Sequence, residues 1–180
     1  FRQKNASDSA RDLHYLRLKP HTMIPYKRHT LSNGLTVAVN RDRQSKLAAV
    51  NILYKVGARN EDPARTGFAH LFEHLMFRGT RDVPDFDLPV QMACGDNNAF
   101  TNNDYTDFYI TLPKDNIETA LWLEADRMTG LDISPEALET EKRVVIEEYK
   151  QRYLNQPYGD QGMLLRSLAY TLHPYRWATI

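Results

Sequence analysis

One stretch, Thr66 to Thr80, constrains this chain more than any other part. It reads TGFAHLFEHLMFRGT and holds His70, Glu73 and His74 in the order H-x-x-E-H. Because an α-helix takes about 3.6 residues per turn, these three side chains share one helix face. Their neighbours are apolar nearly all round, so we expect a buried helix. Buried polar groups are costly unless they are paired, hydrogen-bonded or bound to a metal.

The two histidines offer two of the three protein ligands that catalytic zinc sites commonly use. A helix predicted from Ser134 to about Leu154 offers candidates for the third. Glu141 and Glu148 are two helical turns apart on it and therefore share one face. That face also carries Leu138 and Val145, and a metal ligand with a supporting carboxylate would explain two acidic residues among them.

Three alternatives stay open at this point. Glu147 is a rival third ligand, although it lies about 100° around the helix from Glu148. Glu141 and Glu148 also fit a solvated helix surface, where most such pairs are found. His70 and His74 also fit a metal-free pair of core histidines bonded to backbone carbonyls.

Glu73 lies between the two histidines and need not bind a metal itself. It is placed to take a proton from a water molecule whose pKa a zinc ion lowers to about 7. Hydrolysis of a peptide bond by such a water needs a base close to it. The stretch therefore predicts metal-assisted peptide hydrolysis with Glu73 as the general base.

The order of elements indicates an α+β fold, with a mixed or antiparallel β-sheet packed against several helices. Strands come first, and helices are mixed between the later ones without a regular βαβ rhythm. Asn33-Gly34 between two β-prone runs predicts a hairpin over residues 26–39. We expect Asp62-Pro63 or Thr66 to cap the central helix and Gly79 to end it. Other strands are expected at Leu47–Val56, Ala99–Asn102 and Tyr105–Leu112, and other helices at Asp85–Ala93, Asp115–Met128 and Tyr158–Leu172.

Charge balance and the single cysteine exclude several kinds of partner and bond. Lys plus Arg and Asp plus Glu both number 23, so no basic field favours nucleic acid or an anionic membrane surface. Cys94 is the only cysteine, which excludes an internal disulfide. No apolar run approaches the roughly 20 residues of a membrane helix. We expect a soluble protein of the bacterial periplasm or cytoplasm.

Several stretches resemble one peptidase family. HLFEHLMFRGT, with ETEKRVVIEE about 70 residues later, resembles the inverted-motif zinc peptidases, and among them the pitrilysin, insulinase and mitochondrial processing peptidase family. The resemblance runs from about Thr30 to the end and is closest to the bacterial and processing-peptidase branch. One departure is Cys94-Gly95-Asp96, where many relatives carry two glycines. Further similar segments are LSNGLTVAVN, VGARNEDPARTGFAH, NNAFTNNDYTDFYITLP and LAYTLHPYRWATI.

The resemblance implies a complete site. Zinc would be bound by His70, His74 and Glu148, with Glu73 as the general base and Glu141 in support. It also implies that a peptide substrate binds as an added β-strand, so that backbone hydrogen bonds give affinity and pockets give selectivity. The residues implied for that strand are Asn98, Ala99, Phe100 and Thr101.

Length is the larger departure from the family. Family members have two related lobes, or two subunits, that close around the peptide, and we expect this chain to end within the first. Residues 1–24 are predicted to be an N-terminal extension, and residues 25–180 an N-terminal zinc-peptidase lobe that is incomplete at its C-terminus. We therefore expect the catalytic lobe of a zinc metalloendopeptidase that is poorly active without a second lobe or partner subunit. The alternative is a non-catalytic, substrate-holding or structural subunit of a processing-peptidase-like complex.

Overall fold

The computed structural model describes residues 24–131 and 133–180. Nearly all of the predicted N-terminal extension lies outside these ranges, so the division at residue 24 stays a prediction. The described residues fall into two compact units, which meet between residues 44 and 45 of the chain.

The first unit contains the predicted hairpin. Strands β1 (Lys27–Thr30) and β2 (Thr36–Val39) pair antiparallel. Gly34 lies in the turn between them with a φ of 87°, a left-handed conformation that glycine adopts without a steric penalty. The Asn-Gly signal is confirmed.

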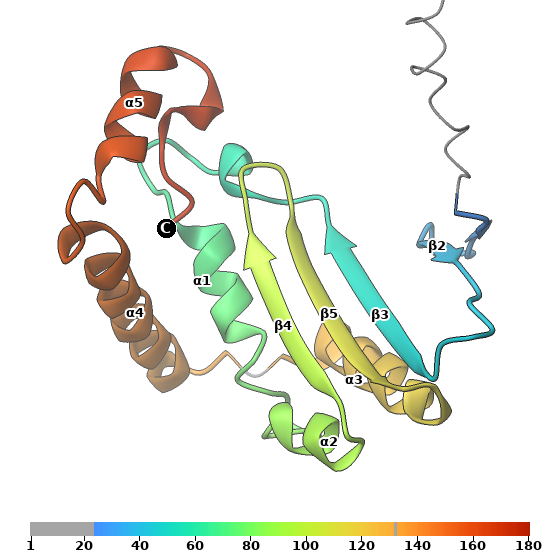
Figure 1. Cartoon of the computed structure of the whole chain (residues 1–180). Coiled ribbons are helices and arrows are strands. Elements are labelled where there is room, and N and C mark those ends of the chain that lie inside the picture. The colour runs from blue at the N-terminus through green and yellow to red at the C-terminus, as the bar shows by residue number, and fades with distance from the viewer. Residues whose placement is uncertain (1–23, 132) are drawn as a thin grey trace, which may run out of the picture. The chain divides into compact units, whose positions relative to one another are not determined.

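The second unit is built on a three-stranded antiparallel sheet. Its strands are β3 (Leu47–Tyr54), β4 (Asp96–Thr101) and β5 (Thr106–Pro113), in the order β3-β5-β4 (Figure 1). Strand β4 begins three residues earlier than predicted, because Asp96 to Asn98 already pair with β5. Among the described strands β4 pairs with β5 alone, so β4 is an edge strand.

Five α-helices in the described ranges accompany this sheet, and α1 lies between α4 and β4 (Figure 1). Ser134 caps α4 as predicted, since its hydroxyl accepts a 3.1 Å hydrogen bond from the Ala137 amide. Helix α5 is shorter than predicted, because Tyr158 has a left-handed φ of 60° before it. The helices are α1 (Phe68–Leu75), α2 (Asp87–Met92), α3 (Ile117–Gly130), α4 (Pro135–Tyr149), which continues into a π-helical turn (Lys150–Leu154), and α5 (Gln161–Ala169). This antiparallel sheet with its helices confirms the α+β class.

The hydrophobic core forms where α2 and α3 pack against one face of the sheet. Burial of its apolar side chains supplies the main driving force for folding of this unit. Its buried members are Val50, Val83, Phe86, Val90, Ala93, Ile110, Leu112, Ala120 and Leu123.

A fully buried ion pair lies next to this core. Glu124 and Arg127 are 2% and 1% exposed, and two nitrogens of the guanidinium meet the two carboxylate oxygens at 2.8 and 2.5 Å. The guanidinium also lies 4.2 Å from the ring centre of Phe108 and 4.5 Å from that of Phe86, within cation–π range. Burial raises the pKa of Glu124, and the cation of Arg127 opposes that rise. This pair was not among the residues predicted from the sequence, although Glu and Arg three residues apart in an apolar helix pattern are a usable signal.

Cys94-Gly95-Asp96, the segment that departs from the two glycines of many relatives, forms the end of α2. Cys94 has a left-handed φ of 54°, and its amide bonds to the Gln91 carbonyl at 2.9 Å. The Gly95 amide bonds to the Val90 carbonyl at 2.8 Å, which completes a Schellman motif. Cysteine therefore occupies a position where glycine is usual, and its side chain is exposed.

No helix in the described ranges combines the length and the apolar character that a membrane span requires.

Candidate functional site

Helix α1 is shorter than the predicted stretch. It begins after Gly67, which has a left-handed φ of 91°, and its last residue is Leu75. The amides of Phe77 and Arg78 then bond three residues back, at 3.1 Å each, in a tight turn. Gly79, predicted to end the helix, instead ends this turn with a φ of 95°, and a Cβ there would collide with the Val83 carbonyl oxygen.

The predicted capping residues of α1 are wrong, because a more distant carboxylate caps this helix. The two oxygens of Glu61 accept hydrogen bonds from the Gly67 amide at 2.9 Å and the Ala69 amide at 2.8 Å. They satisfy amides that have no partner within the helix, and their charge is favourable at the helix N-terminus. The intervening loop bends back, which local sequence patterns did not indicate.

Replacing Glu61 with alanine is expected to lower the free energy of unfolding by about 1–2 kcal/mol, the typical cost of a lost helix cap. Urea unfolding measures the effect. The matched control is Glu139→Ala on α4, because Glu139 is exposed and pairs with exposed Lys142; it should stay within about 0.5 kcal/mol of the parent. Equal losses in the two variants would contradict the capping role.

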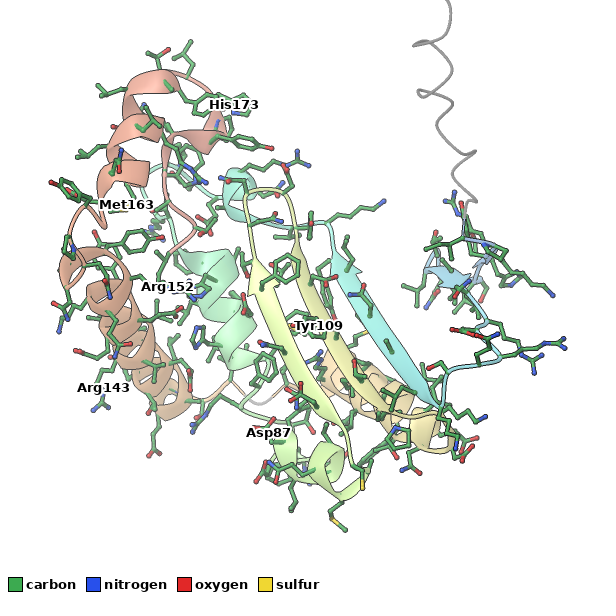
Figure 2. The ribbon with its side chains drawn as sticks, viewed as in Figure 1. Asp87, Tyr109, Arg143, Arg152, Met163 and His173 are labelled. Atoms are coloured by element: carbon green, nitrogen blue, oxygen red, sulfur yellow. The ribbon has the colours of Figure 1, made fainter. Side chains whose placement is uncertain are left out.

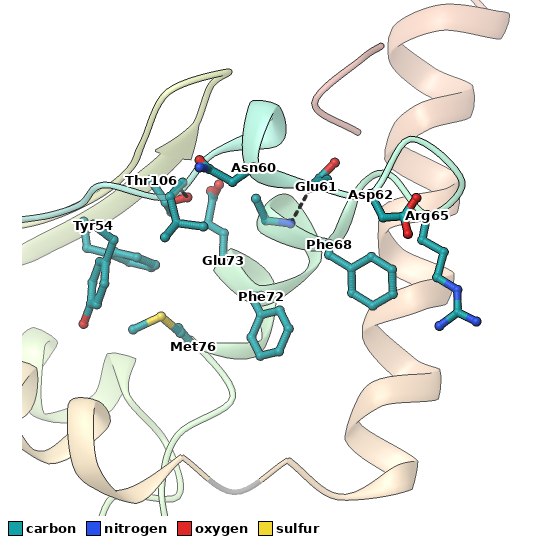
Figure 3. Close-up of a pocket in the computed structure, with 13 residues that line it drawn as sticks. Tyr54, Asn60, Glu61, Asp62, Arg65, Phe68, Phe72, Glu73, Met76 and Thr106 are labelled. Carbon is teal, nitrogen blue, oxygen red and sulfur yellow. Dashed lines mark hydrogen bonds between the residues drawn. The ribbon is translucent and has the colours of Figure 1, made fainter. Parts of the chain in front are cut away.

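The expectation that α1 is buried nearly all round is wrong. Phe68 and Phe72 are 48% and 47% exposed. They line an apolar hollow of about 590 Å³, together with Tyr54 at the end of β3 (Figure 3). The opposite face of α1 carries buried His70 and packs against α4 and β4. Glu73 lines the apolar hollow and also the hollow that contains the histidines.

The structure brings three predicted ligands together. Glu148 Oε2 lies 3.5 Å from His70 Nε2 and 3.2 Å from His74 Nε2. One ligand atom from each residue lies within 4.8 Å of the others. Ligand atoms that surround zinc tetrahedrally at about 2.0–2.2 Å are about 3.3–3.6 Å apart, whereas a direct charge-assisted hydrogen bond would be about 2.7–2.9 Å. The two distances from Glu148 Oε2 fit a shared cation better than direct hydrogen bonds. Within the described residues that oxygen is also buried without a hydrogen-bond partner.

The other two acidic candidates on α4 differ in position: one lies beside His74 and the other on the surface. Glu141 is 8% exposed, and one of its oxygens lies 3.4 Å from His74 Nδ1. A carboxylate beside Nδ1 orients the imidazole and leaves Nε2 free to bind a metal. Glu147 points away from the cluster and pairs with Lys150 at 2.6 Å on the surface.

Arg152, in the π-helical turn that continues α4, adds a cation beside Glu148. Its Nη2 lies 2.6 Å from Glu148 Oε1, and Figure 2 shows it at the C-terminal end of α4, close to α1. Burial lowers the pKa of His70, Glu148 opposes this, and Arg152 adds a smaller lowering. These effects favour the neutral imidazole, which is the form that binds metals.

A hydrogen bond from the sheet holds Glu73, the candidate base. Thr101 Oγ1 donates a short hydrogen bond to Glu73 Oε2. Burial raises the pKa of Glu73, and the hydrogen bond from Thr101 opposes that rise. The second hollow, of about 450 Å³, is lined by the predicted base, the three ligands and the four strand residues Asn98, Ala99, Phe100 and Thr101.

Comparisons with known proteins identify similar peptidases. The profile described as Insulinase (Peptidase family M16) matches residues 36–173. Zinc protease PqqE of Helicobacter pylori is 36% identical over 154 residues, which cover 84% of this chain and 35% of that protein. A probable mitochondrial-processing peptidase subunit beta of Schizosaccharomyces pombe is 33% identical over 124 residues, covering 68% of this chain and 27% of that protein. The crystal structure of a protease from Helicobacter pylori superposes with a TM-score of 0.81 at 35% identity, covering 85% of this chain and 38% of that one.

The antiparallel sheet, the cluster of three predicted ligands and these matches define a metallopeptidase fold. The chain belongs to the insulinase family, peptidase family M16. It spans about a third of the length of the curated relatives described above.

Proposed function

We propose that the chain is the catalytic lobe of a zinc metalloendopeptidase, with His70, His74 and Glu148 as the zinc ligands. The observation that carries the proposal is the placement of Glu148 Oε2 at 3.2 and 3.5 Å from the two imidazole nitrogens. Zinc prefers nitrogen and carboxylate ligands in this number when a fourth position is left for chemistry. Glu141 would support His74, and Arg152 would hold the second oxygen of Glu148.

Glu73 is the proposed general base. When bound, zinc would polarise the scissile carbonyl and lower the pKa of a water molecule to about 7. Glu73 lines the same hollow as the ligands and would take the proton of that water at its free carboxylate oxygen. The same carboxyl group can return the proton to the leaving amine, as general acid–base catalysis requires.

The proposed substrate is an extended peptide bound along β4. Asn98, Ala99, Phe100 and Thr101 lie on this edge strand and line the hollow of the ligands. An added strand would use the free backbone groups of that edge, and the peptide bond to be cut would lie over the metal site. An unfolded or flexible polypeptide segment fits this mode of binding.

A second lobe or a partner subunit is proposed to complete the enclosure. The relatives named above are roughly three to four times as long as the matched region. We expect the 180 residues alone to bind zinc and to hydrolyse peptides poorly, because water would enter an open site. The complete set of three ligands and a base favours an enzyme over a non-catalytic subunit.

Replacing either of two neighbouring glutamates, Glu148 or Glu147, with glutamine tests the proposed ligand set. Glu148→Gln should weaken zinc binding by more than the roughly 10–100-fold typical of losing an outer contact, because a ligand itself is lost. Glu147→Gln makes the same change one residue away, at an exposed side chain, and should leave zinc affinity unchanged. Competition with a chromophoric chelator measures both affinities. Equal zinc affinity in the two variants, or a parent chain that binds no zinc, would overturn the proposed ligand set.

A further inference from the structure

A row of two threonine hydroxyls connects the sheet to the candidate base. Thr101, the last residue of β4, donates through Oγ1 to Glu73 Oε2. Thr106, the first residue of β5, lies directly opposite Thr101 in the strand register, and the two hydroxyl oxygens are 3.3 Å apart. Thr106 in turn donates to the carbonyl oxygen of Val56 at 3.0 Å.

The number of protons decides which of these contacts are hydrogen bonds. A threonine hydroxyl has one proton to donate. Thr106 uses its proton on the Val56 carbonyl, so it can only accept from Thr101. Thr101 has a choice between a neutral hydroxyl at 3.3 Å and the carboxylate of Glu73, and the charged acceptor forms the stronger bond. The bond between Thr101 and Glu73 is therefore the significant one.

The position of Glu73 indicates the role of this hydrogen bond, which is to restrict the conformation of its side chain. Its side chain lies on the wall between the apolar hollow and the hollow of the ligands. A glutamate has several rotatable bonds, and an unrestrained carboxylate would sample both sides of that wall. Thr106 is 6% exposed, so the row starts from a well-buried anchor. Within the described residues Glu73 Oε1 has no hydrogen-bond partner and stays available to a water molecule.

We propose that Thr101 is a positioning residue for Glu73. Its hydroxyl fixes one carboxylate oxygen and leaves the other directed to the proposed site of chemistry. Because Thr101 also ends the strand proposed to receive the peptide, the binding of substrate and the alignment of the base are coupled through one residue. This inference rests on the proposed role of Glu73 as the base.

Melting temperatures of the zinc-free chain test the contact without any need for turnover. Thr101→Val keeps the shape and removes the hydroxyl, and it should lower the Tm by about 2–4 °C, the shift that loss of one ordinary hydrogen bond produces in a chain of this size. In a Glu73→Ala background the same change should have almost no effect, because the partner is gone. Thr101→Ser should behave as the parent. Thr111→Val, at a β5 threonine whose side chain has no hydrogen bond within the described residues, is the control and should be unaffected by Glu73→Ala.

Peptide hydrolysis by the zinc-loaded protein tests the positioning role. Thr101→Val should lower kcat at least 10-fold with KM and zinc content unchanged, and Thr101→Ser should restore kcat. A Thr101→Val variant with parental kcat, or one whose Tm loss is the same with and without Glu73, would overturn the proposal. Turnover is measured with the second lobe or partner subunit present. If the parent protein shows none under that condition, the proposed function is overturned, while the melting temperatures still decide whether the contact exists.

Discussion

Replacing Glu73 with glutamine is expected to leave zinc bound and to lower peptide hydrolysis by about 10²–10⁴-fold, the usual contribution of a general acid–base group. Glutamine has nearly the same shape but cannot accept the proton of the attacking water. The measurement is kcat on an unstructured peptide, with the second lobe or subunit present and with zinc content determined in parallel. His70→Ala gives the contrasting result, because it removes a ligand and should release the metal.

The same substitution should raise the stability of the metal-free protein at neutral pH. Burial raises the pKa of Glu73 above its ordinary value of 4.5, so the folded state disfavours the carboxylate. Its contribution to stability is therefore greatest below pH 4.5 and is lost as the pH rises through the folded pKa. Glu73→Gln removes this penalty, and the gain in Tm at pH 7 should shrink as the pH falls toward 4.5.

Glu147→Gln is the control for both measurements, because it makes the same chemical change at an exposed side chain of α4. It should alter neither hydrolysis nor the pH dependence of the Tm. Substantial activity in Glu73→Gln would exclude Glu73 as the base, even if zinc remained bound.

Replacing Arg127 with methionine is expected to cost about 3–5 kcal/mol of unfolding free energy, the typical penalty for breaking a buried ion pair from one side. Methionine fills much of the same space among the rings of Phe86 and Phe108. It leaves the carboxyl group of Glu124, 2% exposed, without its cation. Chemical denaturation of the zinc-free chain measures the loss, and far-UV circular dichroism shows whether the variant folds.

Two further variants make this prediction sharp. Lys142→Met breaks an ion pair of the same spacing on the surface of α4, where both partners are about half exposed, and should change stability by less than about 1 kcal/mol. The double variant Glu124→Leu with Arg127→Met removes both charges and should recover most of the loss. A double variant as unstable as Arg127→Met alone would show that packing, not the unpaired carboxyl group, causes the effect.

Local sequence patterns predicted most of the elements. The Asn-Gly turn, the Ser134 cap and the α+β class follow from local patterns, and the structure confirms them. The cap of α1 was wrong because Glu61 reaches the helix through a loop that bends back. The exposure of Phe68 was unexpected, because an apolar sequence does not reveal which of its faces has a packing partner.

The candidate site was likewise predictable in part from local spacing, and the rest depends on tertiary packing. Helical spacing placed His70 and His74 on one face, and a two-turn spacing placed Glu141 and Glu148 on another. Spacing left the third ligand open, and only the packing of α4 against α1 brings Glu148 rather than Glu147 to the histidines. The hydroxyl that holds Glu73 comes from β4, and no local pattern connects a strand residue with a helix 28 residues earlier.

Helix α1 has only eight residues, too few to persist by itself in water. A cation held between α1 and α4 would close a loop of the chain from His74 to Glu148, and clips that close long loops limit the freedom of the unfolded chain most. No disulfide can do this work, because the chain has a single cysteine. The metal would then stabilise the fold as well as take part in the reaction. Its loss would destabilise the lobe at helix α1, which carries the proposed base and two of the proposed ligands.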